Sequence, residues 1–154
     1  MIPEYAKGIR PEDMPDTIAR EIAEVFGVEL TLRLLETQGG RVIYFPIASN
    51  LPKSCQQENV SNVKAEELPT DTMRELAGDI GIHQAVELCK YFSGSCVYLP
   101  KLSRTLSVYR NRKIVEEYYC GESEKSLRRK YGITQSYIMR LVKEADKGGI
   151  QDEE

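Results

Sequence analysis

The chain has 154 residues, which suffices for one ordinary domain or two small ones. Hydrophobic residues make up 41% of the chain and charged residues 29%, a balance that permits an apolar core in a soluble protein, and the formal net charge is −3. No apolar run approaches the roughly 20 residues needed to span a bilayer, and the polar, acidic N-terminus differs from a signal peptide, which excludes a membrane-spanning or secreted class.

Residues 1–16 contain three prolines among scattered charges, which predicts an extended or poorly ordered, flexible lead-in. A helix follows with Asp16 or Thr17 as its cap, because apolar residues recur at helical spacing from Ile18 to Phe26. Gly27 interrupts that pattern. We therefore expect a first helix that ends at this glycine.

A second helical pattern runs from Val28 to Leu35 and stops at the pair Gly39-Gly40. The next residues, Arg41–Phe45, include β-branched and aromatic side chains and are closed by Pro46. Such a short run before a proline predicts a strand.

The same succession of two helical patterns and a strand recurs 54 residues later in the sequence. Ile18–Pro46 aligns without gaps on Thr72–Pro100, with eight identities in 29 positions that include the helix-breaking glycines and the final proline. This similarity predicts an internal duplication of a helix–helix–strand unit within residues 17–100, with copies at 18–46 and 72–100. Chance similarity between two amphipathic segments is the alternative.

The segment between the copies, residues 47–71, is polar and contains two prolines, so we expect a linker or a long surface loop. After Pro100, Ser103 is expected to cap a long helix that ends near Gly121. The tail, residues 148–154, is expected to be flexible.

The balance of charged residues changes after Pro100, at the end of the second copy. Residues 1–100 carry 9 Lys+Arg against 15 Asp+Glu, whereas residues 101–147 carry 12 against 6. A basic segment behind an acidic one is typical of a nucleic-acid-binding module on a carrier. A solvated basic face is the simpler alternative.

Residues Ser123 to Glu144 contain two short helical patterns separated by Gly132. Ser123 and Thr134 are suitable caps for the two helices. Apolar faces that meet across a tight glycine-containing turn predict a helix-turn-helix within residues 101–147, whose second helix would lie in the DNA major groove. A plain helical hairpin in a core is the alternative.

On the second helix, Ile138, Leu141 and Val142 are predicted to face inward. The remaining positions form the candidate DNA-reading face: Gln135, Ser136, Met139, Arg140 and Lys143, with Tyr137 at the flank and Thr134 at the start. Gln and Arg side chains can bond adenine and guanine edges in a bidentate manner, and Lys and Tyr reach phosphates. Candidates for backbone contacts are Arg112, Lys113, Lys125, Arg128, Arg129 and Lys130.

Other chemistry is not indicated. The four cysteines, Cys55, Cys89, Cys96 and Cys120, form no CxxC pair, and His83 is the only histidine. Zinc sites need clustered ligands at short spacings, and reduced thiols suit a cytoplasmic protein. There is also no Gly-rich phosphate loop and no GxSxG motif. We expect no metal, no cofactor and no enzyme activity.

Gln84–Glu144 resembles the Mor transcription activator family of phage middle-gene regulators. The matching pieces are CKYF at 89–92, Gly94, VYLP at 97–100, and Tyr118–Ile133 with KYGIT at 130–134. The resemblance implies a mainly α fold with a small antiparallel β-ribbon, in which a helix–strand dimerisation module precedes a helix-turn-helix. It also implies a dimeric activator, phage or prophage in type, that binds promoter DNA and recruits RNA polymerase.

By position, the resemblance implies that Gln135, Ser136, Arg140 and Lys143 face the major groove and that Lys101 contacts the DNA backbone. This chain departs from the family pattern by having two helix–helix–strand copies. We therefore hypothesise that Val42–Phe45 pairs with Cys96–Leu99 inside one chain as an intrachain pseudo-dimer, while a homodimer would supply the second DNA-binding head. An adaptor or co-regulator that keeps the fold without reading DNA is the alternative function.

Overall fold

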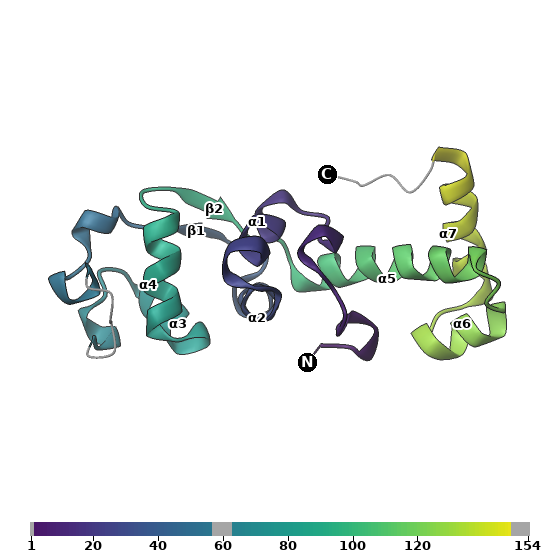
Figure 1. Ribbon diagram of the computed structural model, residues 1–154, viewed down its shortest axis with the longest axis horizontal. Coiled ribbons are helices and arrows are strands. Elements are labelled where there is room, and N and C mark those ends of the chain that lie inside the picture. The colour runs from purple at the N-terminus through teal and green to yellow at the C-terminus, as the bar shows by residue number, and fades with distance from the viewer. Residues whose placement is uncertain (1, 57–62, 149–154) are drawn as a thin grey trace. The chain divides into compact units, whose positions relative to one another are not determined.

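The computed structural model describes residues 2–56 and 63–148. Within these ranges the chain forms seven α-helices and one two-stranded antiparallel sheet (Figure 1). The predicted mainly helical fold with a small antiparallel ribbon is confirmed. The chain divides into two compact units, which we call the carrier unit (residues 22–102) and the head unit (residues 1–21 and 103–154).

The carrier unit contains two successions of helix, glycine, helix and strand. The elements are α1 (Thr17–Phe26, which begins in the head unit), α2 (Val28–Gln38), β1 (Val42–Tyr44), α3 (Asp71–Ile80), α4 (Ile82–Tyr91) and β2 (Cys96–Tyr98). Gly27 and Gly81, which separate the helices of each pair, have nearly the same backbone conformation, with φ of 98° and 94°. Only glycine adopts this region readily. The two segments therefore share the order of their elements and the backbone conformation of the glycine between their helices, as a duplication predicts. Their common origin stays a hypothesis.

The two strands pair with each other in one chain. Val42 lies opposite Tyr98, Ile43 opposite Val97 and Tyr44 opposite Cys96, in antiparallel register. Alternate side chains point to opposite faces of a strand, so the central pair is buried and the flanking pairs are exposed. The strand pairing expected from the sequence is present.

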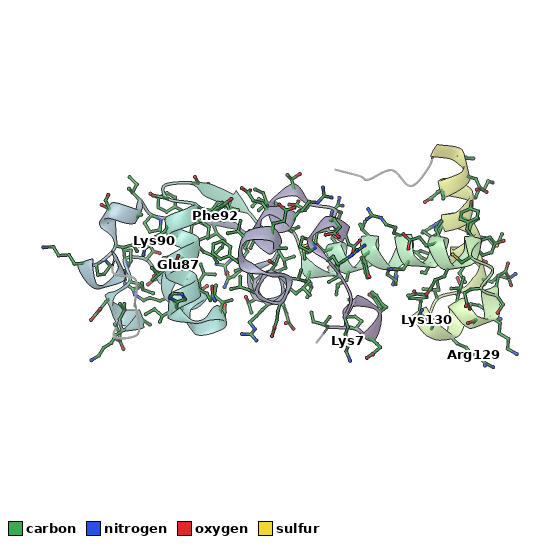
Figure 2. The ribbon with its side chains drawn as sticks, viewed as in Figure 1. Lys7, Glu87, Lys90, Phe92, Arg129 and Lys130 are labelled. Atoms are coloured by element: carbon green, nitrogen blue, oxygen red, sulfur yellow. The ribbon has the colours of Figure 1, made fainter. Side chains whose placement is uncertain are left out.

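Aromatic rings join the strands to the helices of the carrier unit. The rings of Phe45, after β1, and Phe92, after α4, are stacked with centroids 5.5 Å apart (Figure 2 labels Phe92). The Phe92 ring also meets the Tyr91 ring edge-on, with centroids 4.8 Å apart. Such offset and edge contacts are the favoured arrangements of aromatic pairs.

The segment expected as a polar linker contributes to the carrier core. Its described part forms three short 3₁₀-helices, Ala48–Asn50, Lys53–Gln56 and Ala65–Glu67, and residues 57–62 lie outside the described ranges. Its buried side chains are Leu51, Cys55, Val63 and Leu68. The expectation of a surface linker was wrong for these residues, because isolated apolar residues among polar ones show no helical or strand period.

The N-terminal segment also differs from its expectation. Residues 2–16 contain two 3₁₀-helices, Glu4–Ala6 and Pro11–Asp13, and belong to the head unit. Ala6 and Met14 are fully buried, and the Met14 carbonyl accepts a hydrogen bond of 2.9 Å from the Arg20 guanidinium. Asp16 Oδ1 accepts from the backbone of Ile18 at 2.9 Å, which confirms Asp16 as the cap of α1. The lead-in is thus folded onto the head unit.

The remaining helices of the head unit are α5 (Leu102–Tyr119), α6 (Glu124–Tyr131) and α7 (Gln135–Gly148). Because α5 already includes Leu102, Ser103 lies inside the helix, and its prediction as the cap was wrong. Residues 149–154, most of the tail expected to be flexible, lie outside the described ranges. No helix in the described part of the chain is long and apolar enough to cross a lipid bilayer.

Gly39, at the end of α2, allows a close backbone approach that a methyl group would block. A Cβ there would lie 2.2 Å from the Leu35 carbonyl oxygen and 2.8 Å from that of Pro100. We expect Gly39→Ala to lower the free energy of unfolding by about 1–3 kcal/mol, since backbone atoms must move. Urea denaturation measures this change.

Gly78→Ala is the matched control. Gly78 lies inside α3, is exposed, and has no atom within 4 Å of an added Cβ. Alanine there should raise the free energy of unfolding by about 0.5–1 kcal/mol, because glycine is costly inside helices. Equal stability of Gly39→Ala and the wild type would contradict the close approach at the end of α2.

Candidate DNA interface

An apolar cluster joins the three helices of the head unit. Figure 1 shows α6 and α7 gathered at the C-terminal end of α5. The cluster consists of Ile114 and Val115 from α5, Leu127 from α6, and Ile138, Leu141 and Val142 from α7. A helix of eight residues such as α6 is not stable alone in water, so packing in this cluster holds it. The inward face predicted for α7 is confirmed.

The turn between α6 and α7 is short and capped on both sides. Gly132 adopts a left-handed conformation, with φ of 67° and ψ of 36°, and its N–H donates to the Arg128 carbonyl at 2.9 Å. Thr134 Oγ1 accepts from the backbone N–H of Tyr137 at 3.2 Å, and Ser123 Oγ accepts from that of Ser126 at 3.2 Å. The predicted caps, Ser123 and Thr134, are therefore present.

The side of α7 opposite the cluster is exposed. The predicted reading residues Ser136, Met139, Arg140 and Lys143 are exposed on this side, Gln135 and Thr134 are exposed at the start of the helix, and Tyr137 is half-buried. The Arg140 guanidinium lies 3.9 Å from the Glu144 carboxylate, and both side chains are largely exposed. At about 100° per residue, Ser136, Met139, Arg140 and Lys143 share one face of α7, whereas Gln135 lies at the edge of the packed face, three residues before Ile138.

Three of the predicted backbone-contact residues surround a shallow pocket of about 450 Å³ that runs along α6 from its N-cap to its last turn. Its lining consists of Ser123, Lys125, Ser126, Arg129 and Lys130. Arg129 and Lys130 are labelled on α6 in Figure 2. A basic concavity with hydroxyl groups at a helix N-terminus has the chemistry of a phosphate contact.

The other predicted backbone contacts lie elsewhere. Arg112 and Lys113 are half-buried on α5, and the Lys113 ammonium lies 3.8 Å from the Glu116 carboxylate. Arg128 is exposed on α6. This exposure fits a long side chain that directs its charge toward solvent. Lys101 is an exposed residue of the carrier unit.

The Mor transcription activator family model matches residues 56–154, which is more than half of the sequence. This chain belongs to the Mor transcription activator family. Membership implies a role in transcription activation. No curated protein and no solved structure matches the chain significantly.

Within this Mor family head, Glu117 of α5 holds the end of α6. The Tyr131 hydroxyl donates to Glu117 Oε2 at 2.6 Å, and the Lys130 ammonium pairs with Glu117 Oε1. Burial alone would raise the pKa of Glu117, but the hydrogen bonds from Lys130 and Tyr131 outweigh it and lower the pKa below its ordinary value. Burial and the Glu117 carboxylate both raise the pKa of Tyr131. Lys130 is therefore engaged by the protein itself.

The N-terminal segment reaches the same region of the head unit. The rings of Tyr5 and Tyr131 are 5.7 Å apart at an angle of 56°. Together with Glu4, Tyr109 and Glu117 they line a cavity of about 580 Å³. Sequence reasoning missed this arrangement, because nothing local links residue 5 to residue 131.

Sequence reasoning also missed Arg110 and Asn111 of α5, which contact Tyr137 of the predicted reading helix. These contacts span 26 and 27 residues of sequence, and no periodicity indicates them. Among the described residues, no three His, Cys, Asp or Glu side chains are grouped to hold a metal ion. His83 is exposed on α4, and Cys96 and Cys120 are exposed and form no disulfide within the described part of the chain.

The Glu117 contacts predict a pH-dependent stability. Because its pKa is lowered on folding from an ordinary value of 4.5, Glu117 contributes stability above that pH and loses the contribution as the pH falls through its folded pKa. We expect Glu117→Gln to lower the free energy of unfolding by about 1 kcal/mol at pH 7. The difference should shrink below about pH 4.5, as thermal melts at a series of pH values would show.

Glu116→Gln is the control, since it removes the same charge from the exposed neighbour on α5. An exposed ion pair contributes little, so its effect should stay within about 0.5 kcal/mol at every pH. Equal effects of the two substitutions would contradict the role of the Glu117 hydrogen bonds.

Proposed function

We propose that this Mor family member is a transcription activator that binds promoter DNA through a helix-turn-helix formed by α6 and α7 and recruits RNA polymerase. The observation that supports it most is the exposed face of α7, which carries Arg140 and Lys143 on the side away from the apolar cluster, with Gln135 exposed at the first turn. A recognition helix needs this division between a packed face and a polar face.

In this proposal each group of residues has a distinct contact. Gln135, near the start of α7, and Arg140, one and a half turns later, bond the major-groove edges of bases, because their side chains suit adenine and guanine. Lys143 on α7, together with Lys125 and Arg129 of the basic pocket on α6, contacts phosphates. Ser136, Met139 and Thr134 complete the surface against the groove. Lys101, Arg112 and Lys113 supply further backbone contacts.

The carrier unit has a different role in the proposal. Its strands β1 and β2 pair within one chain, which supports the proposal that this ribbon takes the place of a ribbon formed by two subunits. One chain still has one helix-turn-helix, whereas proteins of this type bind paired half-sites about one helical turn of DNA apart. We therefore propose a homodimer that places two heads on one promoter site.

The first test selects bound sites from a random DNA pool and then measures Arg140→Ala on the selected site. If Arg140 reads a base, we expect a loss of about 1–3 kcal/mol in binding free energy and relaxed preference at one position. Fluorescence anisotropy on the selected site and its single-base variants gives both quantities.

Lys143→Ala is the matched control from the same helix face. A phosphate contact does not depend on the base sequence, so this substitution should weaken binding to all sites equally. It should also reduce the slope of log Kd against log salt concentration by about 1. A wild-type chain that binds every sequence equally would refute sequence-specific reading and favour the adaptor or co-regulator role.

The oligomeric state is tested separately by light scattering on the full chain, free and with the selected DNA. We expect two chains on one DNA site, with two half-sites in the selected sequence. A strict monomer in both conditions would overturn the homodimer while leaving DNA binding by a single head intact.

A further inference from the structure

The ring of Tyr137 connects α5 to the proposed reading face of α7. Its hydroxyl accepts a hydrogen bond from Arg110 Nη2 at 3.3 Å and donates one to Asn111 Oδ1 at 3.2 Å. The Arg110 guanidinium also donates to Asn111 Oδ1, at 3.2 and 3.3 Å. Tyr137 is thus anchored to a helix that carries none of the proposed base-reading residues.

The same ring contacts the guanidinium of Arg140. The Arg140 Cζ lies 4.8 Å from the ring centroid of Tyr137, and the Arg110 Cζ lies 5.6 Å from it. Both distances fall within the range of cation–π attraction. The Glu144 carboxylate also lies near Arg140, but it is at the distance limit of an ion pair and exposed to solvent. The ring is therefore the closer restraint on this arginine.

From this geometry we infer that Tyr137 is a positioning residue that presents Arg140 to a base, with Arg110 and Asn111 of α5 holding it in place. The inference rests on the proposed DNA-reading function and deepens it. It departs from the role that the sequence indicated for Tyr137, a phosphate contact, because the Tyr137 hydroxyl already has two protein partners.

The physical reason is the conformational freedom of arginine. An exposed arginine loses much rotamer entropy when a base fixes it, and this loss weakens binding. If the Tyr137 ring already restrains the Arg140 guanidinium in the free protein, Arg140 loses less rotamer entropy when it binds a base that lies in the direction of that conformation. The negative potential of the ring attracts the guanidinium groups of both Arg110 and Arg140, which offsets part of the repulsion between their charges.

The consequence is that α5 helps to set sequence preference without touching a base. Truncation of the ring should affect discrimination between bases, because Arg140 would then sample several directions. Removal of the hydroxyl alone should have a smaller effect, since the ring would stay but lose its anchor on Asn111.

The test is a double-mutant cycle on the selected DNA site and on the single-base variant that Arg140→Ala ceases to distinguish. We expect Tyr137→Leu to reduce the discrimination between the two sites about threefold to fivefold, and Tyr137→Phe about twofold. In the Arg140→Ala background, Tyr137→Leu should change discrimination by less than about 1.5-fold, because the residue through which it acts is absent.

Tyr119→Leu is the matched control. Tyr119 also joins α5 to α7, through a hydrogen bond from its hydroxyl to Asp146, but no arginine lies over its ring in the described part of the head. It should leave discrimination unchanged, and circular dichroism melts confirm that each variant is folded. If Tyr119→Leu lowers discrimination as much as Tyr137→Leu, general packing of α7 explains the effect and the inference is overturned.

The outcomes separate the inference from the proposed function. A wild type without any sequence preference refutes the proposed function, and base positioning with it. A wild type with a preference that Tyr137→Leu leaves intact refutes only the positioning role. An equal loss from Tyr137→Leu with and without Arg140 also overturns it, because Tyr137 would then act on the DNA directly.

A second measurement needs no DNA. The side-chain protons of Arg140 should show an upfield NMR shift from the ring current of Tyr137, which Tyr137→Phe preserves and Tyr137→Leu abolishes. Ordinary shifts for these protons in the wild type would contradict the contact on which the inference depends.

Discussion

The packing of α6 between α5 and α7 is the interaction on which the candidate DNA interface depends. Leu127 is the buried residue of α6, and it meets Ile114 and Ile138, which are fully buried on the neighbouring helices. Because α6 is too short to persist alone, this contact maintains the turn at Gly132 and fixes the rotation of α7. Buried side chains that would not contact DNA thus determine which side of α7 is available to bind it.

The two halves of helix α5 bury opposite sides of the helix, and the second half supports this arrangement. Leu106 and Tyr109 are buried in the first half, and Ile114 and Val115 in the second. At 100° per residue the two faces point about 180° apart, so the helix has no continuous apolar stripe. Asn111 lies three residues before Ile114, on the side of the second face, and so its contact with Tyr137 follows from the same packing.

The sequence predicted what local patterns encode. Glycines at the helix breaks, the caps Ser123 and Thr134, the short β-branched and aromatic run before Pro46 and the inward face of α7 are all visible within a few residues. Contacts between distant residues were missed, such as Tyr5 with Tyr131 and Asn111 with Tyr137, because a single sequence contains no record of them. The burial of Leu51 and Met14 was missed for a related reason, since isolated apolar residues have no period.

The family match also shows why the first 55 residues matter to the fold. The match begins at residue 56, yet β2 inside it pairs with β1 outside it, and Val97 is buried opposite Ile43. In the head unit, Tyr5 packs on Tyr131 of the matched region. Each unit therefore combines matched and unmatched sequence. Because an unpaired β2 would expose its apolar inner face and an open edge, the unmatched N-terminal part is a structural component of the fold.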